Sequence, residues 1–359
     1  MKIALVCTNL GDAWRGLERF TLELFNVVKE DLPITLFGCR LNGRPNEVSL
    51  PCLKDDALLS IFKGRKRDND YFQQLSYALS FIPFVAWQRY DVVHYSQMDL
   101  GIFLWHAKQR FKLKYKILFT NWGLEDRSCF RPDYLQEITP SGYQRTIDLG
   151  VDPRKVTLLP FGVHSKNFLM TTDRNLLREK YGIPREKIVI LSVAALNRRH
   201  KRIDYLIREV SRLGNDYFLL VVGRPEEPDL KILGHQRLGE NFKSIYVEPG
   251  EIPGVYHLAD LFVIPSLIEG FCLALVEAMC AGLPVIAHNA PVFQWVVGEP
   301  CCLVDLRKEG NLARKMEEIF KNYDTFKKIA RSNQTRSSER FDWNRLKPEY
   351  LRLYEKVLG

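Results

Sequence analysis

The chain has 359 residues, of which 46% are hydrophobic and 26% are charged, a composition that is typical of globular proteins and excludes a disordered or fibrous chain. No run of about 18 uncharged apolar residues occurs, which argues against a membrane-spanning helix. The formal net charge is +9, but no recognition motif accompanies the basic residues, so we do not expect nucleic acid as a partner.

The first apolar run, residues 2–7, is too short for a signal peptide and lacks a small-residue cleavage pattern. We interpret it as a buried strand of a cytoplasmic protein. Further short runs rich in β-branched residues follow, and they alternate with amphipathic helical patterns such as 17–28 and 203–210. This alternation predicts an α/β fold with parallel sheets covered by helices on both faces. The other expected strands are 34–39, 91–95, 116–121, 187–193, 217–223, 261–265 and 284–287.

The alternating pattern restarts in the middle of the chain. Residues 161–184 are mostly polar, and a new strand-helix series begins at residue 187. We therefore expect two Rossmann-like, doubly wound domains, 1–165 and 166–340, with ligands bound in a central cleft at the strand C-termini. The segment 341–359 predicts a last helix with Pro348 in its first turn, which either packs on the second domain or crosses back to the first.

The cysteines and the basic clusters each leave a question open. None of the eight cysteines forms a CxxC pair or a metal-like spacing with histidine, so we expect reduced thiols rather than a disulfide framework. Two basic clusters, 63–67 and 108–116, are either solvated surface or patches attracted to an anionic membrane face or a phosphate-bearing acceptor.

The most informative stretch is 265–279, which reads PSLIEGFCLALVEAM. It predicts a strand end, a loop and a helix start, where free N–H groups and the helix dipole suit a diphosphate. Glu269 and Glu277 lie eight residues apart, so they can accept hydrogen bonds from sugar and ribose hydroxyls at two ends of one ligand. The alternative is an ordinary helix with one N-terminal and one solvated glutamate. The loop and helix residues expected to line the diphosphate are Gly270, Phe271, Cys272 and Leu273.

A second cluster, 196–202, carries four cations just after an expected strand. Cations held there would offset the charge that develops on a departing nucleoside diphosphate without a metal ion. Lys201 and Arg198 are the cations that we expect first to bind the diphosphate, and Arg199 is a further candidate. The alternative is a basic surface turn.

Three weaker signals lie in the first half. Gly16, between the first strand and the first helix, would allow close approach of the backbone to a ligand, although an ordinary tight turn also explains it. The motif 68–70 has the DxD form of some metal-dependent sugar transferases, but no strand precedes it, so we assign no metal site. His94 ends an expected strand and either faces the cleft or is a satisfied structural residue.

With these residues in view, the chain resembles the retaining glycosyltransferases of family 4. Glu269 to Glu277 matches that family's E-x7-E signature, and 192–207 resembles its strand, basic turn and helix. Residues 139–141 and 158–163 resemble its approach to the interdomain hinge, and 341–343 its C-terminal tail. The resemblance implies a GT-B fold, retention of anomeric configuration and no metal or other cofactor.

Three positions depart from the family pattern. Ala194-Ala195-Leu196 stands where Gly-Arg-Leu is usual, so Arg198 or Arg199 must substitute for the missing arginine. Cys272 replaces a common glycine in the phosphate-facing loop. Trp122 stands in place of a histidine that often contacts the sugar.

The function that this resemblance implies is sugar transfer from a UDP- or GDP-type nucleotide sugar to a saccharide or lipid-linked acceptor, as in surface polysaccharide or glycolipid synthesis. Two alternatives stay open at this point. One is a nucleotide-sugar epimerase or hydrolase of the same fold. The other is a catalytically degenerate binding subunit, which Trp122 would favour.

Overall fold

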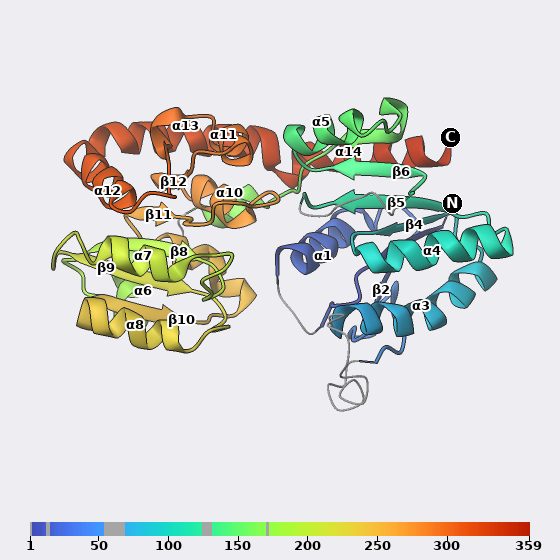
Figure 1. Ribbon diagram of the computed structural model, residues 1–359, viewed down its shortest axis with the longest axis horizontal. Coiled ribbons are helices and arrows are strands. Elements are labelled where there is room, and N and C mark those ends of the chain that lie inside the picture. The colour runs from blue at the N-terminus through green and yellow to red at the C-terminus, as the bar shows by residue number, and fades with distance from the viewer. Residues whose placement is uncertain (1, 12–14, 54–68, 124–130, 170–171) are drawn as a thin grey trace. The chain divides into compact units, whose positions relative to one another are not determined.

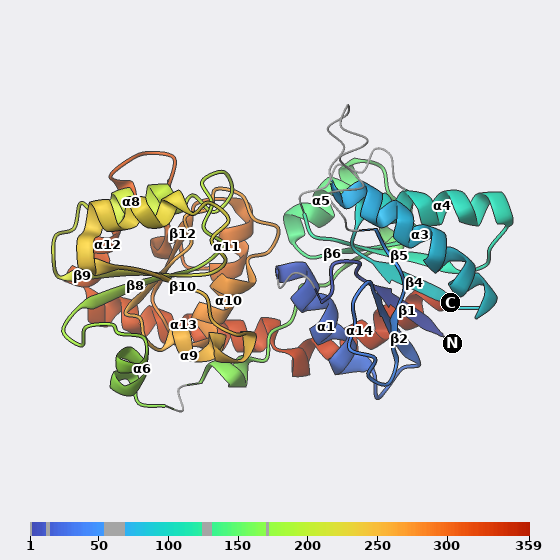
Figure 2. The same cartoon turned by 90° about the horizontal axis from the view of Figure 1, so that it is seen from below.

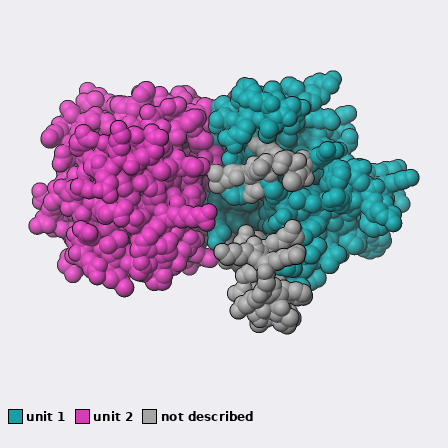
Figure 3. Space-filling view, in the orientation of Figure 1, with its two compact units in different colours: residues 1–162, 346–359 teal, residues 163–345 magenta. Residues whose placement is uncertain are grey.

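The computed structural model describes residues 2–11, 15–53, 69–123, 131–169 and 172–359. They form two compact units, residues 1–162 with 346–359, and residues 163–345, which Figure 3 shows in teal and magenta. The predicted limits, 1–165, 166–340 and 341–359, are close to these. Each unit is a parallel sheet with helices on both faces, as the alternation of strand and helix patterns predicts.

Unit 1 contains a seven-stranded sheet in the order β3-β2-β1-β4-β5-β6-β7, and every pair in it is parallel. Helices α3, α4 and α5 cover one face and α1 and α14 the other (Figures 1 and 2). The strands are Ile3–Val6 (β1), Ile34–Gly38 (β2), Glu47–Ser49 (β3), Val92–Tyr95 (β4), Lys116–Asn121 (β5), Tyr134–Glu137 (β6) and Val156–Leu158 (β7). The helices are Gly16–Val28 (α1), Asn69–Trp87 (α3), Met98–Phe111 (α4), Pro140–Asp148 (α5) and Trp343–Leu358 (α14).

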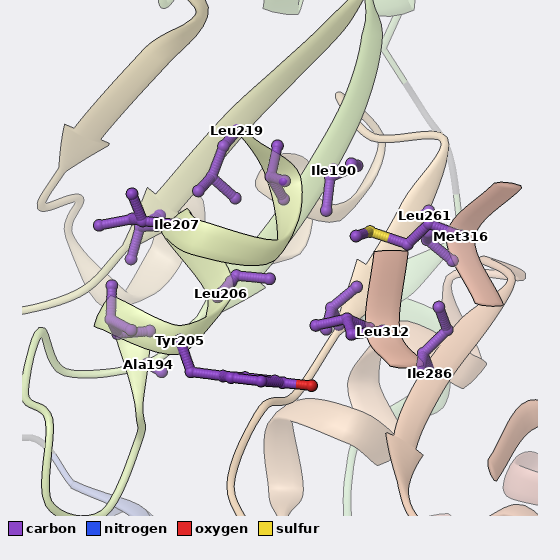
Figure 4. Close-up of a cluster of buried hydrophobic side chains, with 14 of the residues drawn as sticks. Ile190, Ala194, Tyr205, Leu206, Ile207, Leu219, Leu261, Ile286, Leu312 and Met316 are labelled. Atoms are coloured by element: carbon purple, nitrogen blue, oxygen red, sulfur yellow. The ribbon is translucent and has the colours of Figure 1, made fainter. Parts of the chain in front are cut away.

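Unit 2 contains a six-stranded parallel sheet in the order β10-β9-β8-β11-β12-β13. One of its cores lies between the sheet and α7, α8 and α12, and Figure 4 shows part of it. The strands are Ile188–Val193 (β8), Tyr217–Val222 (β9), Phe242–Ile245 (β10), Leu261–Val263 (β11), Val285–His288 (β12) and Leu303–Val304 (β13). The helices are Arg174–Lys180 (α6), Ile203–Val210 (α7), Asp229–Leu238 (α8), Ile252–Tyr256 (α9), Leu273–Cys280 (α10), Pro291–Val297 (α11), Asn311–Lys321 (α12) and Tyr323–Phe341 (α13).

All eight expected strands are present, with ends that differ by at most two residues. Five further strands were not predicted. Four of them, β3, β7, β10 and β13, are the outer strands of the two sheets, and β6 lies next to one. Outer strands have a partner on one side only, and these are short and partly polar, so they lack the continuous apolar run that marks a buried strand.

The last helix, α14, lies within the expected segment 341–359 but begins well before Pro348. It starts at Trp343, so Pro348 lies inside the helix rather than in its first turn, which corrects that prediction. The helix begins at Trp343 because the Asp342 carboxylate accepts the N–H of Asn344 at 2.8 Å, as an N-cap does. From Leu346 onward the helix belongs to unit 1.

A buried chain of hydrogen bonds attaches α14 to the sheet of unit 1. His94 Nδ1 lies 2.8 Å from the Tyr354 hydroxyl, and His94 Nε2 lies 2.6 Å from the Thr120 hydroxyl. Thr120 donates to Gln136 Oε1 at 2.7 Å, and the Gln136 amide donates to the Tyr350 hydroxyl at 2.7 Å. His94 is therefore a structural residue, and the alternative that it faces a cleft is wrong.

One pair of cysteines corrects the expectation of reduced thiols. Cys39 and Cys52 form a disulfide, with their Cα atoms 5.8 Å apart. Strand β3 pairs in parallel with β2, and the N–H of Leu50 donates to the Gly38 carbonyl at 3.0 Å. This pairing brings together two cysteines whose spacing in the sequence carries no signal. Among the residues that the structure describes, five further cysteines are free, namely Cys7, Cys272, Cys280, Cys301 and Cys302.

The basic run 63–67 and Asp68 of the DxD motif lie outside the described residues. Of the helices that the structure describes, none combines the length and the apolar character needed to cross a bilayer.

The environment of His94 predicts a specific loss of stability in acid. Burial lowers the pKa of His94 from its ordinary value of 6.5 to about 3. Because the unfolded chain then binds a proton that the folded chain does not, the stabilisation is complete above pH 6.5 and declines as the pH falls towards 3. Between these values we expect a loss of about 1.4 kcal/mol per pH unit from this residue.

This loss is measured by urea unfolding between pH 7 and pH 4, with His94→Gln as the non-titrating comparison. The variant should start with lower stability at pH 7 and lose less on acidification than the wild type. Equal acid dependence in the two proteins would contradict the assignment.

Candidate active site

The predicted loop and helix start after β11 are present in unit 2. Helix α10 begins at Leu273, and Cys272 is its N-cap residue. The Leu275 N–H donates to the Cys272 carbonyl at 3.1 Å, which leaves the earlier N–H groups of the turn for an anion. The ring of Phe271 packs edge-on against Phe341, with centroids 5.3 Å apart, and thereby holds the loop in place.

The two predicted motifs meet through one ion pair. Lys201 Nζ lies 2.6 Å from Glu269 Oε1, although the residues are 68 positions apart in the sequence. The Glu269 side chain is 8% exposed and that of Lys201 21%. His200 adds a second contact between the same segments, since its Nε2 lies 3.0 Å from the Ile268 carbonyl. The basic turn and the glutamate loop therefore form one site.

Asn197 organises the basic turn, and the sequence analysis missed it. Its Oδ1 accepts the N–H groups of His200 at 3.0 Å and of Lys201 at 2.7 Å. Arg202 follows with a left-handed φ of 49°, and its guanidinium donates to the carbonyls of Pro265 at 3.1 Å and Leu306 at 3.0 Å. An asparagine that opens a turn is the available sequence signal, because its side chain often bonds the backbone that follows.

Glu277 lies on α10 with only 2% of the residue exposed, so the alternative of a solvated glutamate is wrong. Its Oε2 accepts a hydrogen bond of 2.6 Å from the hydroxyl of Tyr256, which ends α9. Tyr256 is a second residue that the sequence analysis did not single out. Its hydroxyl holds the Glu277 carboxylate in a fixed orientation.

The thiol of Cys272 is buried at the start of α10. Burial raises the pKa of Cys272, the carboxylates of Glu269 and Glu277 raise it further, and Lys201 lowers it. The start of α10 thus combines the paired Lys201 and Glu269 with the buried Glu277 on the helix itself. This grouping is what binding of one extended anionic ligand requires.

Known proteins resemble this chain in sequence and in fold. Residues 173–336 match the family model described as glycosyl transferases group 1. The MMP alpha-(1->4)-mannosyltransferase of Mycolicibacterium hassiacum is 25% identical over 236 residues, 64% of this chain and 55% of that protein. The UDP-Gal:alpha-D-GlcNAc-diphosphoundecaprenol alpha-1,3-galactosyltransferase of Escherichia coli is 25% identical over 317 residues, 80% of each chain.

The first of these relatives is matched over only about half of its own length. Among solved structures, sucrose-phosphate synthase from Thermosynechococcus elongatus superposes with a TM-score of 0.83 at 17% identity, covering 99% of this chain and 98% of that one. The chain has the GT-B fold. The match over 173–336 supports the group 1 glycosyltransferase family, and this segment contains every site residue predicted in unit 2.

Within this GT-B protein, the two arginines of the basic turn differ in their contacts. The Arg198 guanidinium bonds Asp229 and Glu227, both at 2.5 Å, and these two carboxylates raise its pKa. Arg199 is exposed and has no hydrogen-bond or ion-pair partner among the residues that the structure describes. The structure thus brings Lys201 to Glu269, but it directs Arg198 to a different pair of carboxylates.

The predicted residues of unit 1 have ordinary local roles in the structure. Gly16 is exposed and opens α1, and its assignment to ligand binding stays a prediction. The indole N–H of Trp122 donates to the Ser96 carbonyl at 3.1 Å, so this group does not replace a histidine as a hydrogen-bond donor to a sugar.

The conformation of Cys272 generates a prediction about stability. Its φ of 72° lies in the left-handed region, which costs an L-residue about 1–2 kcal/mol and favours glycine. We expect Cys272→Gly to be more stable than Cys272→Ala by about 1 kcal/mol.

Urea unfolding of the two variants measures this difference. Ala278, in the interior of the same helix, is the matched control, because glycine there should be less stable than alanine. A lower stability of Cys272→Gly than of Cys272→Ala would contradict the left-handed conformation.

Proposed function

We propose that this protein is a retaining glycosyltransferase that moves a sugar from a UDP- or GDP-type nucleotide sugar to a saccharide or lipid-linked acceptor. The observation that carries the proposal is the ion pair between Lys201 and Glu269, which joins a basic turn to a helix start beside the buried Glu277. A nucleotide sugar has three chemical features: an anionic diphosphate, the hydroxyls of the ribose and the hydroxyls of the transferred sugar. Each of them has a suitable partner among these residues.

The proposed binding mode follows from these groups. The N–H groups at the start of α10, from Gly270 to Leu273, and the ammonium of Lys201 would hold the diphosphate. The Glu277 carboxylate, already oriented by Tyr256, would accept hydrogen bonds from the ribose hydroxyls. Glu269 would accept them from the hydroxyls of the transferred sugar.

In the proposed reaction, the acceptor oxygen attacks the anomeric carbon from the face that the diphosphate leaves. The new bond joins the acceptor oxygen to the anomeric carbon, and the bond from that carbon to the phosphate oxygen breaks. The acceptor proton passes to the departing phosphate oxygen. The cations and the helix start offset the charge that develops there, so we expect no metal ion or other cofactor to be needed.

The acceptor and the compartment are further parts of the proposal. The Escherichia coli relative is named for a UDP-galactose donor and a diphosphoundecaprenol-linked acceptor, which supports a lipid-linked saccharide as one acceptor class. We expect unit 1 to bind the acceptor. Action at the cytoplasmic face of a membrane, in polysaccharide or glycolipid synthesis, is consistent with such an acceptor.

A transferase differs from the two alternatives in its products. An epimerase or hydrolase would release nucleoside diphosphate and a free sugar without acceptor, whereas a degenerate binding subunit would bind donor and never consume it. Thermal unfolding with UDP-, GDP- and ADP-sugars identifies the donor first, because a ligand at about 100 times its dissociation constant adds about 2.7 kcal/mol of stability. Product analysis with and without acceptor extracts then separates the three functions.

Removal of the central charges should abolish most of the activity. We expect Lys201→Ala and Glu277→Gln each to lower kcat/KM for transfer by about 100-fold or more, the usual effect of removing one preorganised electrostatic contact. Lys180→Ala is the matched control, because Lys180 pairs with Glu251 elsewhere in unit 2. Near-normal transfer by both site variants, with unchanged thermal unfolding, would exclude the site.

The two arginines should differ in their effect on donor binding. Arg199 has no partner to release in the part of the chain that the structure describes, whereas Arg198 must leave two carboxylates before it can bind phosphate. We therefore expect Arg199→Ala to weaken donor binding about tenfold, the loss of one charge-assisted hydrogen bond of about 1.5 kcal/mol or more. Arg198→Ala should weaken it less than threefold, that is by under about 0.7 kcal/mol, in line with its exposed ion pairs. Calorimetric titration measures the donor dissociation constants of both variants. A larger loss of affinity in Arg198→Ala than in Arg199→Ala would identify Arg198 as the diphosphate ligand.

A further inference from the structure

The outer face of α3 in unit 1 is unusual for a surface helix. From Tyr71 to Trp87 the helix carries no charged residue, although the exposed face of such a helix is normally charged or polar. Its inner side is buried in the core and includes Tyr77, Phe81 and Val85. On the opposite side Leu79 is 72% and Trp87 is 76% exposed, and Pro83 between them is exposed as well.

A second exposed aromatic residue lies at the same edge of the sheet. Phe111 ends α4 and is 66% exposed. The connections after α3 and α4 lead into the paired strands β4 and β5, whose first residues, Val92 and Lys116, are register partners. The N–H of Lys116 donates to the Asp91 carbonyl at 2.7 Å. Figures 1 and 2 both show α3 and α4 side by side, and Trp87 and Phe111 are the last residues of these two helices.

Cations surround this apolar surface. The Arg110 guanidinium lies 5.8 Å from the centre of the Phe111 ring. Lys112, Lys114 and Lys116 follow the helix and are all exposed. Lys108, by contrast, is paired with Asp133 at 2.5 Å. Arg110 lies in the last turn of α4, where a cation interacts favourably with the helix dipole. The three later lysines follow the end of the helix, and the dipole does not account for them.

We propose that this surface, made of Leu79, Trp87, Phe111, Lys112, Lys114 and Lys116, docks on an anionic lipid bilayer. Exposed aromatic side chains beside lysines are the combination that binds the interface of an anionic membrane, with the rings at the headgroup level and the cations on the lipid phosphates. A second protein copy would place the same lysines opposite one another, which is unfavourable. The inference concerns where unit 1 binds and is independent of the transfer chemistry proposed for unit 2.

The test is co-sedimentation of the full chain with vesicles of phosphatidylcholine, and with vesicles of phosphatidylcholine and phosphatidylglycerol in equal parts. We expect binding to the anionic vesicles and a decline of this binding with added salt. Lys112→Gln, Lys114→Gln and Lys116→Gln combined should lower partitioning about a hundredfold, since each lysine near such a surface contributes about fivefold. Trp87→Ser and Phe111→Ser should each lower it about tenfold.

Matched controls come from unit 2. Lys321, Lys327 and Lys328 are three exposed lysines, and Ile232 is an apolar side chain that is 60% exposed. Their Gln and Ser variants should leave vesicle binding unchanged. Donor consumption by the surface variants should equal that of the wild type, which separates a failure of this inference from a failure of the proposed function.

Equal binding of the wild type and the lysine variant to anionic vesicles would overturn the proposal. A second pair of results would also overturn it: the wild type does not bind vesicles, and sedimentation velocity shows that it is a dimer whereas Trp87→Ser is a monomer. That second result would assign the surface to another copy of the chain.

Discussion

The arrangement of the candidate site depends on the burial of one carboxylate. The Glu269 side chain is 8% exposed, and a carboxylate removed from water requires a charged or hydrogen-bonding partner. Lys201 supplies that partner and in doing so joins the basic turn to the loop before α10. One N–H of the Lys201 ammonium donates to Glu269, and an ammonium carries three, so the same cation can serve a phosphate as well. The basic turn and the glutamate loop are thus held together by contacts within unit 2.

The loop that carries Glu269 is also coupled to the segments where the chain passes between its two units. Phe271 packs on Phe341, and the next residue, Asp342, accepts two hydrogen bonds from Ser165, from its N–H at 3.0 Å and its hydroxyl at 2.5 Å. The Val163 N–H donates to the Phe341 carbonyl at 2.8 Å. The loop is therefore packed against a residue that is bonded to both crossing segments, and all of these contacts lie within unit 2.

Local sequence patterns predicted the parts of the fold that local physics determines. Long apolar runs identified the central strands, and the glutamate loop was recognisable because a strand end, a Gly and a helix start follow one another. The outer strands and the disulfide of Cys39 and Cys52 depend on pairing across the sheet, which leaves no periodic signal. The sequence does not distinguish the two arginines for a related reason. Arg198 and Arg199 are identical neighbours in the sequence, and only the position of Glu227 and Asp229 on another segment distinguishes them.

The role of His94 could not be predicted from the local sequence either, because it depends on residues up to 260 positions away. A single placement of hydrogens satisfies the whole buried chain. Tyr354 donates to Nδ1 of His94, Nε2–H donates to Thr120, Thr120 donates to Gln136, and the Gln136 amide donates to Tyr350, which donates to the Pro160 carbonyl at 2.9 Å. A protonated His94 would have two donors and could no longer accept from Tyr354. The neutral ring is therefore the form that fits this arrangement, and protonation would weaken the attachment of α14 to the sheet.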